Sequence, residues 1–261
     1  MKYFIVNAFT RSRDGGNPAA VCLPENPVTD KKMQEISTDF GLSETAFVEK
    51  KDGFYGLRWF TPEIEVELCG HATLAAAHVL LEQGVAFSET LIEFETKSGR
   101  LTAEKNDRLI LMDFPSEEAA RSECPQELLN ALGVEPIYTG RNRFDYILEL
   151  ESENVLREIS PDYELLSKVE TRGVIVTSAS ESKDYDFVSR FFAPGTGIPE
   201  DPVTGSAHCC LAPYWSGKLN KTTMTGFQAS ERGGTVQVRL KENRVILGGE
   251  AVTLSSGKLM D

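Results

Sequence analysis

Two short stretches of the chain, "RWFTP" at residues 58–62 and "RFFAP" at residues 190–194, share one pattern: arginine, aromatic residue, phenylalanine, small residue, proline. The offset between them is 132 residues (190 minus 58). The same offset relates two further pairs, Gly41 with Gly173 and Asp30 with Asp162. A constant offset across three elements favours an internal duplication over chance matching. The 261 residues are therefore predicted to form two similar halves.

Both halves have the same order of expected elements. A helix-like segment is followed by a strand-like one, a polar turn and then the Arg-aromatic-Phe strand. A glycine next precedes a run of small and apolar residues, which is "HATLAAAHVLLEQ" after Gly70 and "SAHCCLAPYWSG" after Gly205. These glycines are 135 residues apart (205 minus 70), so the second half has about three extra residues in the preceding loop.

The runs after the two glycines predict helices. The first is apolar nearly all round as far as Leu81 and closes at Gly84, so we expect a buried helix. In the second, Pro213 is expected to limit or kink the helix. Residues 91–114 and 233–257 hold polar turns between apolar runs, which is the pattern of hairpins.

These patterns predict an α+β fold of two pseudo-symmetric domains, each with a curled antiparallel β-sheet or barrel around a central α-helix. The expected domain limits are 1–115 and 125–261, separated by the polar and acidic segment 115–124. The last strand of the second domain is free to pack on the first half.

Composition excludes several classes of protein. The formal net charge of -13 argues against nonspecific binding to nucleic acid or to anionic membranes. Residues 68–81 are too few and too polar to span a bilayer, and Asn7 and Arg11 interrupt the N-terminal apolar run too early for a signal peptide. Five cysteines without a CxxC pair and three histidines without an HExxH pattern argue against a disulfide framework and a metal site. We therefore expect a cytoplasmic protein with no bound metal.

Gly70 and Gly205 are candidate ligand-binding positions. Pockets form preferentially between domains, and a glycine at a helix start lets the backbone approach a ligand closely. Unpaired N–H groups of a first helical turn favour an anion. We therefore expect the two helix starts to hold a substrate carboxylate in a cleft between the halves, although both glycines could merely permit tight turns.

Two carboxylates distinguish the halves. Glu44 occupies the position of Val176 in the repeat, so an apolar strand carries an acid in one half only. Burial would raise the pKa of Glu44 and suit it to general acid or base catalysis, whereas a solvent-facing glutamate would be inert. Asp201 lies in the longer loop of the second half, four residues before Gly205, and could also be a helix-capping acid.

Two further polar residues follow the paired glycines. His71 lies in the first turn after Gly70, where the helix dipole favours a neutral ring, and Ser206 takes the matching place after Gly205. A neutral imidazole and a hydroxyl suit hydrogen bonding or proton relay. Each alone would also be compatible with a structural role.

Four motifs follow one another along the chain: "GNPAAVCL" (16–23), "LSETAFV" (42–48), "RWFTPEIEVELCGHAT" (58–73) and "EDPVTGSAH" (200–208). Together they resemble the PhzF-like isomerases of phenazine biosynthesis, in the diaminopimelate epimerase-like superfamily. The resemblance implies two pseudo-symmetric domains, each a curled antiparallel sheet around a central helix, with the site between them. It also implies that the protein uses no cofactor or metal and forms a homodimer.

The resemblance implies roles for individual residues. In the phenazine enzyme the glutamate of the Ser-Glu-Thr motif moves a proton between carbons of a cyclic substrate, and the matching residue is Glu44. The implied catalytic residues are Glu44, His71 and Asp201. The implied substrate-binding residues are Asn17, Cys69, Gly70, Gly205 and Ser206.

Cys69 leaves an alternative mechanism open. Its place before Gly-His resembles the first catalytic cysteine of the racemase relatives, but "PVTG" (202–205) lacks the second thiol. A two-thiol racemase is disfavoured, while a mixed site with Cys69 or Glu44 facing Asp201 stays possible, as does a packing role for this thiol. The cysteines expected to be structural are Cys22, Cys124, Cys209 and Cys210.

The sequence thus predicts a cofactor-independent isomerase that transfers a proton on a small carboxylate-containing metabolite. The alternatives are a racemase or epimerase using Cys69 and a non-catalytic protein that binds a small carboxylate. A serine nucleophile at Ser206, with His208 and Asp201, would be a third possibility but lacks a nucleophile-elbow motif.

Overall fold

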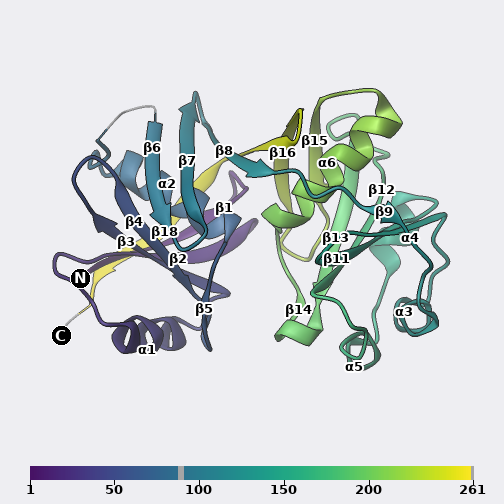
Figure 1. The fold of residues 1–261 in the computed structure, drawn as a ribbon, viewed down its shortest axis with the longest axis horizontal. Helices are drawn as coiled ribbons and strands as arrows, with labels where there is room; N and C mark the ends of the chain where they lie inside the picture. Colours follow the sequence, from purple (N-terminus) through teal and green to yellow (C-terminus); the bar gives the residue numbers. More distant parts are fainter. Residues whose placement is uncertain (88–90, 260–261) are drawn as a thin grey trace. The chain divides into compact units, whose positions relative to one another are not determined.

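The computed structural model describes residues 1–87 and 91–259, and its contacts divide the chain into two compact units. The first unit is Met1–Asp113 with Gly248–Asp261, and the second is Phe114–Leu247 (Figure 1). The C-terminal segment therefore lies with the first unit, as the sequence analysis allowed for the last strand, and the second unit ends at Leu247 rather than at residue 261. The physical reason is a long antiparallel pairing of the last strand with the first, from Lys2 opposite Lys258 to Ala8 opposite Ala251.

The elements that begin in the first unit are mostly strands. They are β1 (Lys2–Ala8), β2 (Asn17–Leu23), α1 (Asp30–Phe40), β3 (Glu44–Lys50), β4 (Tyr55–Phe60), β5 (Glu65–Val66), α2 (Gly70–Glu82), β6 (Leu91–Thr96), β7 (Gly99–Asn106), β8 (Leu109–Pro115) and β18 (Ala251–Lys258). Strands β18, β1 and β2 pair antiparallel, as do β3 with β4 and β6 with β7 and β8. The predicted hairpins of residues 91–114 are therefore confirmed.

The expectation of a purely antiparallel sheet is wrong. β2 pairs parallel with β3, and β4 pairs parallel with β6. In both cases a helix connects the two strands, α1 in the first pair and α2 in the second. A helical crossover returns the chain to the same end of the sheet, and the next strand then runs parallel. The fold is mixed α and β and rich in strands.

Helix α2 is the buried centre of the first unit. It packs against β1, β2, β3 and β18, and its side chains from His71 to Val79 are buried apart from His78, which is partly exposed. Alanines and leucines cover every side of this helix, so each face can contact a strand. The prediction of a buried helix is confirmed, and Gly84 follows its end with a φ of 62°.

The second unit repeats the strand pairings of the first. Its elements are β9 (Ala120–Arg121), α3 (Gln126–Leu132), β10 (Tyr138–Arg141), β11 (Asp145–Glu149), α4 (Glu153–Glu158), α5 (Tyr163–Leu166), β12 (Gly173–Ala179), β13 (Phe187–Ala193), the 3-10 helix η1 (Pro194–Thr196), β14 (Ile198–Glu200), α6 (Gly205–Leu219), β15 (Thr223–Gln228), β16 (Gly234–Lys241) and β17 (Arg244–Gly249). The pair β11–β12 is parallel like β2–β3, and β13–β15 is parallel like β4–β6. The antiparallel pairs β10–β11, β12–β13, β13–β14 and β15–β16 match β1–β2, β3–β4, β4–β5 and β6–β7.

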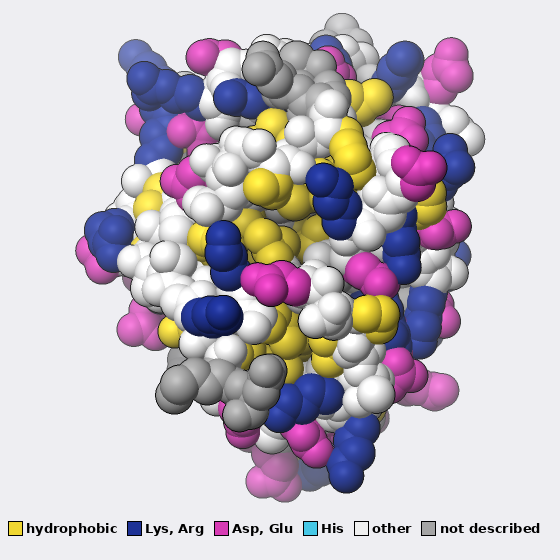
Figure 2. Space-filling view, turned by 90° about the vertical axis from the view of Figure 1, so that its left-hand side faces the viewer, with side chains coloured by type: hydrophobic (Ala, Val, Ile, Leu, Met, Phe, Trp, Pro, Cys, Tyr) yellow, Lys and Arg dark blue, Asp and Glu magenta, His cyan; other side chains and the backbone are white. Residues whose placement is uncertain are grey.

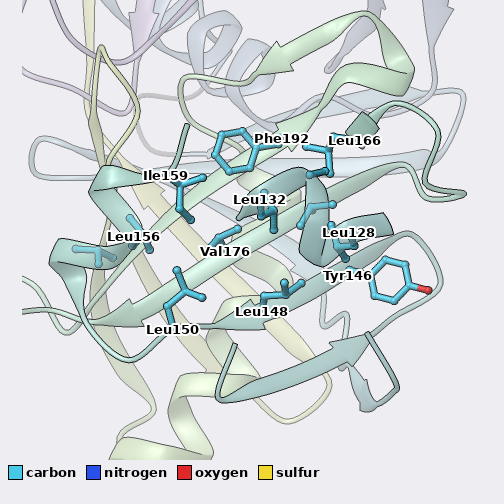
Figure 3. Close-up of a cluster of buried hydrophobic side chains, with 13 residues drawn as sticks. Leu128, Leu132, Tyr146, Leu148, Leu150, Leu156, Ile159, Leu166, Val176 and Phe192 are labelled. Carbon is cyan, nitrogen blue, oxygen red and sulfur yellow. The ribbon is translucent and has the colours of Figure 1, made fainter. Parts of the chain in front are cut away.

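Apolar side chains fill the second unit on both faces of β11 and β12. Figure 3 shows Leu148 and Val176 from these strands beside Leu128 and Leu132 of α3 and Phe192 of β13. On α6, Trp215 donates a hydrogen bond from Nε1 to Thr177 Oγ1 of β12 at 3.0 Å. Strands covered on both faces are apolar along their whole length rather than at alternate residues, which explains the continuous burial of β12 up to Ser178.

Helix α6 continues through Pro213 to Leu219, so the first of the two expected effects of this proline, limiting the helix, is wrong. A proline inside a helix has no N–H for the carbonyl four residues earlier, here that of Cys209. In this protein the backbone N–H of Glu117 donates to the Cys209 carbonyl at 3.0 Å instead. The segment 115–124 thus supplies the hydrogen bond that the Cys209 carbonyl lacks within the helix. Although its sequence has no strand pattern, it also contains the short strand β9.

The surface of the first unit has an apolar hollow. A space of about 320 Å³ is lined by Met33, Phe47 and Leu57 together with charged residues such as Arg58 and Lys97. Figure 2 shows a face on which hydrophobic side chains lie in a depression among lysine, arginine and acidic side chains. None of the predicted site residues lines this space. In the part of the chain that the structure describes, no helix combines the length and hydropathy needed to cross a membrane.

Candidate active site

Glu44 is the first residue of β3 and is buried. Its side chain is 14% exposed, so the alternative of a solvent-facing glutamate is wrong. Removal from water raises the pKa of the Glu44 carboxyl, and hydrogen bonds from Ser43 and Cys69 oppose this rise in part. A carboxyl group in this state can hold a proton at a higher pH than an exposed one, as a general acid or base requires.

His71 lies against Glu44 at the start of α2. Its Nε2 is 3.2 Å from Glu44 Oε2 and its Nδ1 is 3.3 Å from Asn17 Nδ2. Because the Asn17 amide donates to Nδ1, the neutral ring has its proton on Nε2, on the side of the glutamate. Oε2 is buried and makes no hydrogen bond of good geometry to any residue the structure describes. One carboxylate oxygen is therefore close to a proton donor and open to a further partner.

Ser43 is a site residue that the sequence analysis missed. Its Oγ lies 3.4 Å from both Asn17 Oδ1 and His71 Nε2, and it also hydrogen-bonds the carboxyl of Glu44. Its position directly before Glu44 in "LSETAFV" could have indicated that it belongs to the site. However, serine is also common in ordinary turns and loops, so this position alone was not specific. The structure thus brings together the predicted residues Asn17, Glu44 and His71 and adds Ser43.

Cys69 completes this cluster. Its Sγ is 3.5 Å from His71 Nδ1, and the thiol also hydrogen-bonds Glu44. Glu44, Cys69 and His71 place potential metal-ligand atoms within 4.8 Å of one another. One nitrogen of His71 lies near both of the other ligand atoms, so the geometry of this trio is compatible with a bound metal ion as well as with proton exchange between the three groups.

The two glycine-led helices both start without a side-chain cap, as does α3, which follows Pro125. Cys69 precedes α2 and Thr204 precedes α6, and neither side chain caps its helix among the described residues. Three other helices are capped by their own side chains, namely α1 by Thr29, α4 by Ser152 and α5 by Asp162. Side-chain caps satisfy N–H groups of the first turn. The helices that begin at Gly70 and Gly205 thus lack this internal partner.

In the second unit, Asp201 is 8% exposed and lies in the loop before α6. Its Oδ2 accepts a hydrogen bond of 2.5 Å from the hydroxyl of Thr204, a residue that the sequence analysis did not select. Gly205 is buried and Ser206 is partly exposed in the first turn of the helix. The Thr204 hydroxyl therefore fixes the nearly buried Asp201 carboxylate in place. The N-cap position of α6 belongs to Thr204 and not to Asp201.

The serine-nucleophile alternative does not fit the structure. His208 is fully buried, and its Nδ1 donates to the backbone carbonyl of Thr204 at 2.9 Å. Its ring packs against Phe187. A catalytic triad needs the histidine to lie between the nucleophile and the acid and to hydrogen-bond both. His208 instead uses Nδ1 to donate to the backbone carbonyl at the start of α6. Burial lowers the pKa of His208 to about 4.

Acid is expected to destabilise the protein through His208. The unfolded chain binds a proton at this residue below its ordinary pKa of 6.5, whereas the folded protein resists protonation until about pH 4. Stability is therefore present above pH 6.5 and is lost as the pH falls toward 4, by about 3 kcal/mol from this group. His208→Asn, which keeps a donor for the Thr204 carbonyl, should lose less stability over this window in urea unfolding at pH 7 and pH 4.5. An equal loss in both proteins would contradict the assignment.

Comparison with known proteins agrees with this fold and identifies the family. Residues 6–257 match the family model described as phenazine biosynthesis-like protein. An uncharacterized isomerase of Halalkalibacterium halodurans is 51% identical, with 98% of this chain and 97% of that protein covered, and one of Pseudomonas aeruginosa is 44% identical over 99% and 98%. A PhzF-family structure from Enterococcus faecalis is 42% identical, covers 99% of this chain and 98% of its own, and superposes with a TM-score of 0.95.

A more distant structure, a probable proline racemase of Agrobacterium radiobacter, shares the fold at 12% identity and a TM-score of 0.66. The chain therefore shares the fold of that racemase. By its family match and its relatives it belongs to the PhzF family of isomerases.

Proposed function

We propose that the protein is a cofactor-independent isomerase that moves a proton on a small carboxylate-containing metabolite, with Glu44 as the general acid and base. The observation that carries the proposal is the buried Glu44 carboxyl with Oε2 open beside His71 Nε2. A protonated Glu44 can deliver its proton to one carbon of the substrate, and the resulting carboxylate can take a proton from another. A raised pKa brings the two states of this carboxyl closer in energy near neutral pH.

His71 is proposed to stabilise Glu44 after it has given up its proton. Nε2 of the ring lies 3.2 Å from Oε2, so a small rotation of either side chain would let the Nε2–H donate to the carboxylate form. Asn17 fixes the ring through Nδ1, and Ser43 bridges Asn17 and His71. These contacts support a role of His71 in proton transfer and a role of Asn17 and Ser43 in orientation.

Gly70, in the uncapped first turn of α2, and Gly205 and Ser206, in that of α6, are proposed as substrate-binding residues through their backbone amides and the Ser206 hydroxyl. The absence of side-chain caps on these two helices supports this assignment. Asp201, in the second unit, is proposed as a further catalytic residue. The repeated order of strand pairings supports the inference that the halves arose by duplication and contribute matching helix starts.

Proton exchange in heavy water tests the function directly. The protein is incubated in D₂O with small carboxylic acids, and deuterium incorporation into carbon positions is followed by mass spectrometry. Enzyme-dependent incorporation supports an isomerase. A non-catalytic binding protein would instead show thermal stabilisation by a carboxylate with no incorporation. We also propose that the protein forms the homodimer implied by the family resemblance. Its molar mass, measured by light scattering as it elutes from a size-exclusion column, tests this.

A second candidate is an epimerase in which the Cys69 thiol transfers the proton. It is favoured by the contacts of Sγ with Glu44 and, at 3.5 Å, with His71 Nδ1. If Glu44 is the base, Cys69→Ser should keep deuterium incorporation within about tenfold of the unchanged protein. Abolished incorporation would establish the thiol mechanism. Cys22→Ser is a matched control, because Cys22 is also buried and burial raises the pKa of its thiol to about 12.

A further inference from the structure

Gln228, the last residue of β15, is fully buried beside the loop of Asp201. Its Nε2 donates to the Asp201 carbonyl at 2.7 Å and to Thr204 Oγ1 at 3.2 Å. Its Oε1 accepts from the backbone N–H of Thr204 at 2.9 Å. One amide side chain thus spans the loop from Asp201 to the start of α6, where the second half has its extra residues.

These contacts fix the direction of the Thr204 hydroxyl. Its oxygen receives a proton from Gln228, and its own single proton goes to Asp201 Oδ2 at 2.5 Å. Threonine before a helix ordinarily accepts a hydrogen bond from the N–H of the second or third helical residue. Thr204 makes no such bond. Thr29 shows the ordinary arrangement in this protein, with Oγ1 accepting from the N–H of Lys32 at 3.3 Å.

We propose that Gln228 is a positioning residue that holds the Thr204 hydroxyl on Asp201 and so keeps the first turn of α6 open to a ligand carboxylate. The identity of that ligand rests on the proposed function, whereas the orientation of Thr204 does not. In the first unit no equivalent device is needed, because the residue before α2 is Cys69 and a thiol is a weak acceptor.

Gln228→Met tests the proposal because methionine has a similar size but neither donates nor accepts like the amide. Released from Gln228, Thr204 should rotate and cap α6, so that the amide of Ser206 or Ala207 exchanges with D₂O about two- to tenfold more slowly. A merely structural role for Gln228 predicts faster exchange as the loop loosens. Faster or unchanged exchange at both amides would overturn the proposal. Gln237→Met, at an exposed position of β16, is the matched control.

Thr204→Val gives an independent test that leaves Gln228 in place. If Thr204 does not cap α6, amide exchange of Ser206 and Ala207 should stay within about twofold of the unchanged protein. The same substitution at the true cap, Thr29→Val, should speed exchange of the Lys32 amide about two- to tenfold. Acceleration at Ser206 or Ala207 in Thr204→Val would overturn the proposal.

Kinetics give a readout that also reports on function. Since a capping Thr204 would compete with the substrate carboxylate, Gln228→Met should raise KM more than it lowers kcat on any acid that exchanges its protons. The exchange measurements on backbone amides need no substrate. A fully active Glu44→Gln would therefore overturn the proposed function and leave the result on Gln228 unaffected. Faster or unchanged amide exchange in Gln228→Met would overturn the proposal for Gln228 and leave the proposed function unaffected.

Discussion

Glu44→Gln is expected to reduce proton exchange on the substrate by about 100-fold or more, the usual contribution of a general acid or base. Glutamine keeps the size of the side chain and can still accept a hydrogen bond from His71, but it cannot take or release the proton. The measurement is the rate of deuterium incorporation in heavy water. Glu49→Gln is the matched control, because Glu49 lies on the same strand with its side chain 40% exposed.

The same substitution should make the folded protein more stable at neutral pH. The pKa of Glu44 is raised by burial, so ionisation of this carboxyl costs stability as the pH rises above its unfolded value of about 4.5. Glutamine removes that cost, and the thermal midpoint should rise by about 2 °C or more at pH 8. The difference should shrink below pH 4.5, where the glutamate is protonated in both states. An inactive variant that is less stable at pH 8 would instead indicate that Glu44 holds the fold together.

The repeated arginine pattern could be recognised in the sequence because each unit uses the arginine for the same ion pair with a glutamate. Arg58 forms a two-pronged ion pair with Glu65 on β5, and Arg190 forms one with Glu200 on β14. The acids are 135 residues apart (200 minus 65), the same offset as the two helix-start glycines. In each unit the pair fixes the short strand that leads toward the uncapped helix. The buried helix α2 was equally predictable, since its residues are apolar on every side.

Other features depend on partners distant in the chain and left no local pattern. Parallel pairing of β2 with β3 follows from the crossover of α1 and not from the residues of either strand. Pro213 is tolerated because Glu117, almost a hundred residues earlier, donates to the freed carbonyl. Gln228 looks like any polar residue at a strand end, and only the fold shows that its amide spans the loop of Asp201.

Arg190→Met is expected to lower the free energy of unfolding of the second unit by about 3–5 kcal/mol, because it leaves a nearly buried carboxylate without its partner. The side chains of Arg190 and Glu200 are 10% and 17% exposed, and the guanidinium donates through Nε and Nη2 at 2.8 and 2.9 Å. Its Nη1 also donates to the carbonyls of Leu156 and Ile159, at 3.3 and 2.7 Å. Methionine fills similar space but satisfies none of these acceptors. Urea unfolding followed by the fluorescence of Trp215, which lies in this unit, measures the loss.

The matched control is Arg58→Met in the first unit. There the arginine side chain is 28% exposed and Asp30 is 79% exposed, and the buried Glu65 (14% exposed) would keep a second cation, Lys97, at 2.5 Å, so the loss should be about 1–2 kcal/mol. Adding Glu200→Met to Arg190→Met should recover part of the larger loss, since no buried charge then remains unpaired. A loss below about 1 kcal/mol for Arg190→Met alone would show that Glu200 reaches water without its arginine. In that case the strand before Asp201 would owe its position to Gln228 and the sheet rather than to the ion pair.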